Sequence, residues 1–127
     1  MDMQWHDELP EQCPPQEAVL PSNMIIYRAV RTLPPTEDDF ESQRVMYPKQ
    51  LFNVDECRAR SLSVSTEPTP CEHLIRIPNR PERFVAKIRL TEESGLILKT
   101  GKRTHFSWWR ARDFDPIAAT ELPEDSV

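Results

Sequence analysis

The alternation of apolar and polar positions along this chain predicts a β-sheet rather than a helical bundle. Residues 83–90 show it most clearly, because every second side chain is apolar and charged side chains fall between them. The predicted core face of that strand consists of Phe84, Ala86, Ile88 and Leu90. Related patterns predict further strands at 24–31, 60–65, 96–100, 104–109 and 116–119.

Helical signals are short and lie between these strands. Thr36 precedes a run of acidic residues, which is typical of a capped first helical turn, so residues 36–42 are predicted to be helical. A second short helix is predicted over 68–75, whereas residues 49–59 are expected to be irregular. The predicted fold class is therefore α+β, with a mostly antiparallel sheet of five or six strands and one or two short helices.

Composition divides the chain into a body and two acidic ends. Residues 1–23 contain several prolines and acidic residues but no Lys or Arg, which predicts a mobile, acidic, proline-rich arm. Residues 24–120 are predicted to form a single domain, and residues 121–127 an acidic tail. The body holds more basic than acidic residues, although the whole chain has a net charge of −5. The acidic ends either compete with a polyanion for the basic body or only keep the protein soluble.

The cysteines and the hydropathy bear on chemistry and location. Cys13, Cys57 and Cys71 are odd in number and widely spaced, so they predict neither a disulfide framework nor a zinc site. We therefore expect reduced thiols, no metal and no cofactor. No apolar stretch approaches the ~18 residues of a membrane span, and no signal-peptide pattern is visible. The expected location is cytoplasmic.

Residues 99–112 combine cations with aromatic rings and are the strongest candidate for binding a partner. Neighbouring strand residues point to opposite faces, so Trp109 is expected to be exposed if Trp108 lies in the core. An exposed indole beside arginine is typical of a protein–protein interface, unless the N-terminal arm folds back over it. The candidate partner-binding residues are Lys102, Arg103, Trp109, Arg110 and Arg112. The same cations would suit nucleic-acid phosphates, although the acidic pI of about 5.2 argues against that partner.

The order of short motifs over residues 27 to about 118 resembles a group of small, functionally uncharacterised bacterial proteins. The resemblance rests on the segments Asp39-Phe40-Glu41-Ser42 and Ser61-Leu62-Ser63-Val64-Ser65-Thr66, which match the group's DF-x-S segment and GLSV-aromatic-x-T strand. Ser61 stands where the group usually has glycine, and Ser65 where it has an aromatic residue. This resemblance implies no particular activity.

A more distant similarity is to ADP-ribosyltransferase-type folds, through Arg28 on an early strand and Ser63-Val64-Ser65-Thr66 on a middle strand. That similarity implies that Arg28 would pair with the pyrophosphate of NAD and Ser63 would orient its ribose. The glutamate that such folds carry on a late strand has no counterpart here. His105 is either a general base in the same cleft or a hydrogen-bonded strand residue.

Two functions thus remain open from the sequence. The first is a non-enzymatic protein that binds another macromolecule, as an accessory subunit, inhibitor or immunity-like partner. The second is a nucleotide- or RNA-processing enzyme whose degenerate cleft uses Arg28, Ser63 and His105. A concave site that gathers these three residues would favour the enzyme, whereas an open aromatic surface would favour the binding protein.

Overall fold

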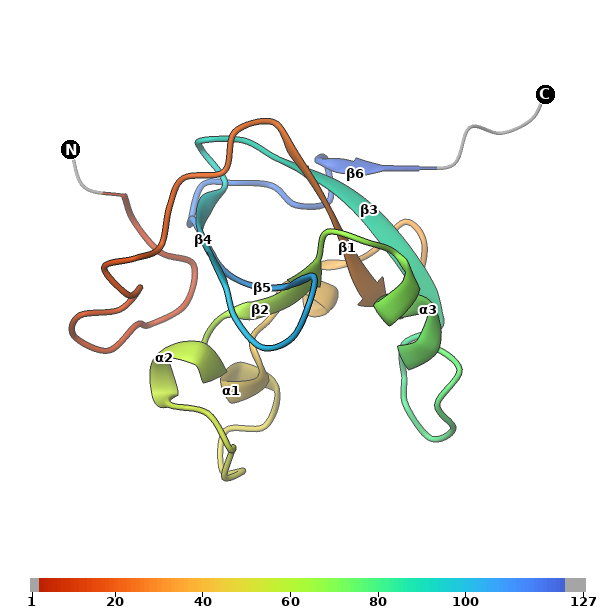
Figure 1. Cartoon of the computed structure of the whole chain (residues 1–127). Coiled ribbons are helices and arrows are strands. Elements are labelled where there is room, and N and C mark those ends of the chain that lie inside the picture. Colours follow the sequence, from red (N-terminus) through yellow and green to blue (C-terminus); the bar gives the residue numbers. More distant parts are fainter. Residues whose placement is uncertain (1–2, 123–127) are drawn as a thin grey trace.

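The computed structural model describes residues 3–122 and contains one antiparallel sheet of six strands (Figure 1). The strands are β1 (Met24–Val30), β2 (Leu62–Ser65), β3 (Phe84–Leu90), β4 (Gly95–Lys99), β5 (His105–Arg110) and β6 (Thr120–Glu121). Their order across the sheet is β4-β5-β2-β1-β3-β6. The α+β fold class is confirmed, although the last strand was expected at 116–119. Asp115 accepts hydrogen bonds from the backbone of Ile117 and Ala118, which turns the chain there instead.

The helices are η1 (Glu37–Phe40), α1 (Gln43–Met46), α2 (Glu56–Ala59) and α3 (Thr69–Leu74). The expected helices near 36–42 and 68–75 correspond to the 3₁₀ helix η1 and to α3. There are more short helices than expected, because α1 and α2 each form a single capped turn. Ser42 Oγ accepts from the backbone of Val45, and Asp55 Oδ1 accepts from the backbone of Arg58 at 2.8 Å.

The core lies on one face of this curved sheet. Pairing of β1 with β3 places Ile26 opposite Ile88, and pairing of β2 with β5 places Leu62 opposite Trp108. The fully enclosed members of the core are Ile26, Val30, Phe40, Ala86, Ile88, Leu90 and Trp108. The expected face of β3 is thus confirmed except at its first residue, Phe84, which is 45% exposed.

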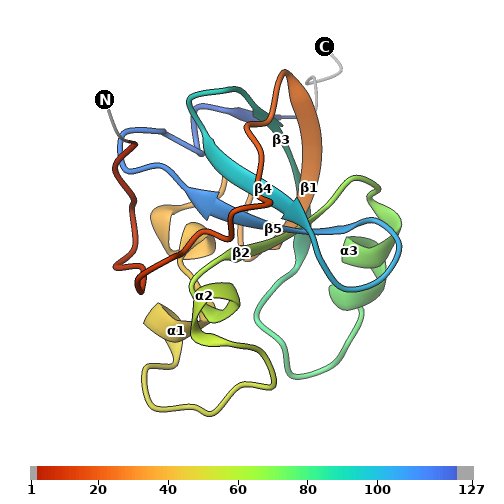
Figure 2. The ribbon, with the colours of Figure 1, turned by 60° about the vertical axis from the view of Figure 1, so that its left-hand side comes forward.

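The N-terminal segment, residues 3–23, is packed against the body, and the expectation of a mobile arm is wrong. Val19 exchanges two backbone hydrogen bonds of 2.8 Å with Ile97 on β4, and Trp5 forms a bridge with Ala111. The free edge of β4 provides unpaired backbone groups, which explains why an extended segment pairs there. Figure 2 shows the segment passing along this side of the sheet.

Cys13 in the N-terminal segment forms a disulfide with Cys57 in α2, which corrects the expectation of three reduced thiols. The two residues are 44 positions apart, and only the tertiary fold brings their Cα atoms to 5.6 Å. Cys71 in α3 is a buried free thiol. None of the helices within residues 3–122 has the length and apolar composition that crossing a bilayer requires.

Candidate functional site

A pocket of about 350 Å³, lined by both charged and apolar side chains, lies against the sheet between two groups of helices. Its wall on one side comes from α1 and α2, and on the other from α3, which stand apart below the sheet in Figure 1. Residues of β1, β2, β5 and η1 and of several connecting segments form the remaining wall. The volume falls within the range of sites that hold small molecules.

The pocket gathers the three residues that the sequence nominated for an enzyme cleft. Arg28 comes from β1, Ser63 from β2 and His105 from β5, and all three line it. They lie far apart in the sequence, and the strand order β5-β2-β1 makes them neighbours. The feature that was expected to distinguish an enzyme-like cleft from an open binding surface is therefore present.

Arg28 is a fixed cation within this site. Its Nε donates to the carbonyl of Asp39 at 2.8 Å and its Nη1 donates to the carbonyl of Ser63 at 2.7 Å. Asp39 in turn accepts from the backbone of Arg31 and Thr36 through its two carboxylate oxygens. Burial lowers the pKa of Arg28 to about 10, and the nearby Asp39 carboxylate opposes this shift, so the side chain stays charged at neutral pH.

The imidazole of His105 is held by Thr100 through one ring nitrogen, and the other ring nitrogen faces no hydrogen-bond partner within residues 3–122. Its Nδ1 lies 3.0 Å from the carbonyl oxygen of Thr100, and donation to that oxygen requires the proton on Nδ1. Nε2 is then an acceptor, and it has no hydrogen-bond partner within residues 3–122. Burial lowers the pKa of His105, the nearby cations Arg58 and Lys99 lower it further, and the Thr100 hydrogen bond raises it. The ring is thus a neutral acceptor at neutral pH.

Two arginines in the pocket were missed by the sequence analysis. Arg31 and Arg58 are half-buried, and in the described part of the chain their guanidinium groups form neither an ion pair nor a hydrogen bond. Among the other charged lining residues, Arg80 pairs with Glu82 at 2.9 Å, Glu41 contacts His6, and Asp39 accepts two backbone hydrogen bonds. The carboxylate of Asp38 also lines the pocket and forms no ion pair or hydrogen bond within residues 3–122. No sequence signal marked Arg58, because it falls in a stretch that was expected to be irregular.

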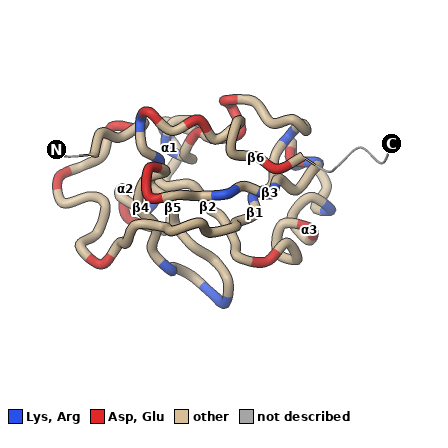
Figure 3. The backbone as a smooth tube through the Cα atoms, turned by 90° about the horizontal axis from the view of Figure 1, so that it is seen from above, with Lys and Arg blue, Asp and Glu red and all other residues tan. Residues whose placement is uncertain are grey.

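The expected aromatic interface is not exposed. Trp109 is 1% exposed, and its Nε1 donates to the carbonyl of Cys57 at 2.9 Å. Arg110 is also buried and pairs with Glu37 at 3.0 Å. This arrangement agrees better with the alternative that the N-terminal arm folds back over Trp109, because the N-terminal segment and α2 cover this face of β5. Of the five candidate partner-binding residues, Lys102, Arg103 and Arg112 are exposed. Figure 3 marks all basic and acidic positions of the described chain along the backbone.

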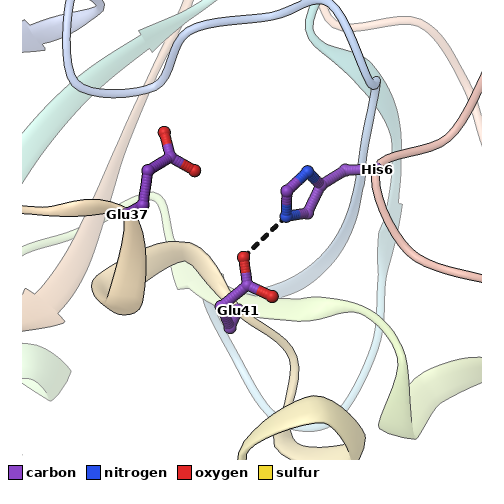
Figure 4. A group of neighbouring side chains, drawn as sticks. All are labelled: His6, Glu37 and Glu41. Atoms are coloured by element: carbon purple, nitrogen blue, oxygen red, sulfur yellow. Dashed lines mark hydrogen bonds and ion pairs between the residues drawn. The ribbon is translucent and has the colours of Figure 1, made fainter.

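A second group of polar side chains joins the N-terminal segment to η1 (Figure 4). Ligand atoms of His6, Glu37 and Glu41 all lie within 4.8 Å of one another, and His6 Nε2 is 2.6 Å from Glu41. The buried guanidinium of Arg110 lies 3.0 Å from Glu37 and 3.4 Å from His6 Nε2. A protein cation already faces these carboxylates, so we interpret the group as a structural contact.

A scan against protein-family models finds no match, and searches of curated proteins and of solved structures find none either. The resemblances to small bacterial proteins and to ADP-ribosyltransferase-type folds therefore stay predictions.

Proposed function

We propose that this chain binds a small phosphate-bearing molecule of about mononucleotide size in the pocket beside Arg28, Ser63 and His105. The observation that carries the proposal is a pair of guanidinium groups, those of Arg31 and Arg58, that have no partner within residues 3–122 and lie in a pocket of about 350 Å³ that also holds the fixed cation Arg28. Several separate cations suit the multiple charges of a phosphate better than a single carboxylate. The Ser63 hydroxyl and His105 Nε2 supply polar contacts for sugar hydroxyl groups.

This proposal takes precedence over the macromolecule-binding hypothesis because burial removes Trp109 and Arg110 from the proposed interface. A protein or nucleic-acid partner for Lys102, Arg103 and Arg112 stays a prediction. Catalysis on a nucleotide or RNA also stays a prediction, and it would require the binding proposed here as its first step.

The cytoplasmic location belongs with these proposals. The Cys13–Cys57 disulfide bears on it, because disulfides persist in oxidising compartments and are mostly transient in a reducing cytosol. The free thiols can be counted in protein that is alkylated as it is extracted from its native host. The count would decide whether Cys13 and Cys57 are oxidised or reduced there.

Calorimetric titration with AMP, and separately with pyrophosphate, tests the proposal. We expect saturable binding to the wild-type protein that weakens as the salt concentration rises. Arg58→Ala and Arg31→Ala should each weaken AMP binding by about tenfold or more, because each removes a charge-assisted contact. Arg112→Ala is the matched control, since Arg112 is exposed and lies outside the pocket. If the wild type binds neither probe, or if the Arg58 and Arg112 variants behave alike, the proposal is wrong.

A further inference from the structure

The disulfide is attached to the wall of the pocket. Cys57 lies within α2, and the next residue is Arg58, a pocket arginine whose guanidinium has no partner in the described part of the chain. Helix α2 spans only Glu56–Ala59, and a single turn has little stability without tertiary contacts. The position of Arg58 therefore depends on what holds α2 to the rest of the molecule.

Contacts on three sides hold α2 in place. The carbonyl of Cys57 accepts from Trp109 Nε1, and its sulfur bonds to Cys13. Arg60, directly after α2, pairs with Asp7 at 2.8 Å, and Glu56 pairs with Arg44 at 2.9 Å. The disulfide is the covalent member of this set, and it involves the residue beside Arg58.

On the other side, the disulfide fixes a loop of the N-terminal segment. The backbone hydrogen bonds of residues 10–18 are local: the N–H of Cys13 donates to the carbonyl of Pro10 at 3.3 Å, and that of Ala18 to the carbonyl of Pro15 at 3.0 Å. The flanking residues Trp5 and Val19 are bound to the sheet. Opening the disulfide would thus free the loop from α2 while leaving both of its ends attached.

We propose that Cys13–Cys57 is a redox-sensitive clasp that sets the affinity of the pocket for its anionic ligand, an inference that rests on the function proposed above. In the oxidised protein the clasp holds α2, and Arg58 is preorganised for the ligand. In the reduced protein α2 retains its noncovalent contacts but loses the clasp, so Arg58 samples more positions. Binding must then restrict that motion, which lowers the affinity.

The chemistry of the switch is thiol–disulfide exchange. Two molecules of a low-molecular-weight thiol supply two electrons and two protons, leave as one molecule of their own disulfide, and produce free thiols at Cys13 and Cys57. Cys71 does not take part, since it is buried in the wall formed by α3, away from α2. Burial also raises the pKa of Cys71 to about 11, which keeps its thiol protonated.

Calorimetric titration with AMP, before and after reduction by dithiothreitol, tests the clasp. We expect AMP binding to weaken by about threefold or more on reduction, as preorganisation is lost. Cys13→Ser should show the weaker binding in both conditions, and Cys71→Ser should retain the redox dependence of the wild type. Circular dichroism at the titration temperature verifies that each sample is folded.

A second measurement does not need a ligand. The NMR signal of the Arg58 Nε–H group should shift and report greater motion on reduction, whereas that of Arg112 should stay unchanged. If oxidised wild-type protein binds neither AMP nor pyrophosphate, the proposed function fails and the clasp fails with it. If AMP binds equally well before and after reduction, or if the Arg58 signal does not change, the clasp alone is overturned.

Discussion

Arg28 on β1 donates a hydrogen bond of 2.7 Å from Nη1 to the backbone carbonyl of Ser63 on β2. The backbones of the two strands pair at Tyr27 and Ser65, and the Arg28 side chain adds a second link between the strands at Ser63. Its Nε binds the carbonyl of Asp39 in η1. One guanidinium therefore joins three segments beside the pocket, which makes Arg28 a structural residue as well as a candidate ligand contact.

Replacing Arg28 with methionine should lower the free energy of unfolding by about 1–3 kcal/mol, because the carbonyls of Asp39 and Ser63 lose charge-assisted hydrogen bonds. Arg31→Met is the matched control, since the Arg31 guanidinium has no partner within residues 3–122, and its effect should stay within about 0.5 kcal/mol. Urea denaturation followed by circular dichroism measures both. Equal effects of the two substitutions would show that Arg28 does not tie β1 to β2.

Trp109→Ala should destabilise the fold by about 3–5 kcal/mol, since it empties an enclosed aromatic site and removes the shorter of the two hydrogen bonds that the Cys57 carbonyl accepts. Arg112→Ala, only a few positions away and exposed, should change stability by no more than about 0.5 kcal/mol. Thermal denaturation of the two variants measures the contrast. A stable Trp109→Ala protein would support the exposed position that the sequence analysis assigned to this residue.

Local pattern predicted most of the sheet, and the errors at Trp109 and at the cysteines arose where distant segments meet. Alternation identified the buried residues Ala86, Ile88 and Leu90, because every second side chain of a half-buried strand points into the core. The alternation pattern failed at Trp109, since both faces of β5 are covered. The sequence of a strand does not show that another segment packs over its second face. The Cys13–Cys57 pairing was hidden for the same reason.

The candidate site was predicted in part. Arg28, Ser63 and His105 were nominated from chemistry and a distant resemblance, and the strand order places them at one pocket. Arg58 was missed because its helix is a single turn, fixed by a cap and by tertiary contacts rather than by helical periodicity. Short elements of this kind carry too few residues for a periodic signal.

The lowered pKa of His105 predicts a specific dependence of stability on pH. The folded protein binds the His105 proton less readily than the unfolded chain does, whose pKa is 6.5. The contribution of His105 is therefore fully present above pH 6.5 and is lost as the pH falls through the folded pKa. NMR titration of the ring should give a midpoint below 6.5. The difference in unfolding free energy between wild type and His105→Gln should be constant above pH 6.5 and should shift against the wild type as the pH falls below it.

Deleting residues 1–19 should strongly destabilise the protein, because this change removes the disulfide, the Val19 pairing and the contacts of His6 and Asp7 together. The disulfide alone should contribute about 2–4 kcal/mol by restricting the unfolded chain. That loss corresponds to a fall in melting temperature of roughly 7–15 °C for a domain of this size. Cys13→Ser separates the two contributions, since it retains the noncovalent contacts and should melt between the wild type and the deletion. A deletion variant that melts within a few degrees of the wild type would restore the mobile arm that the sequence predicts.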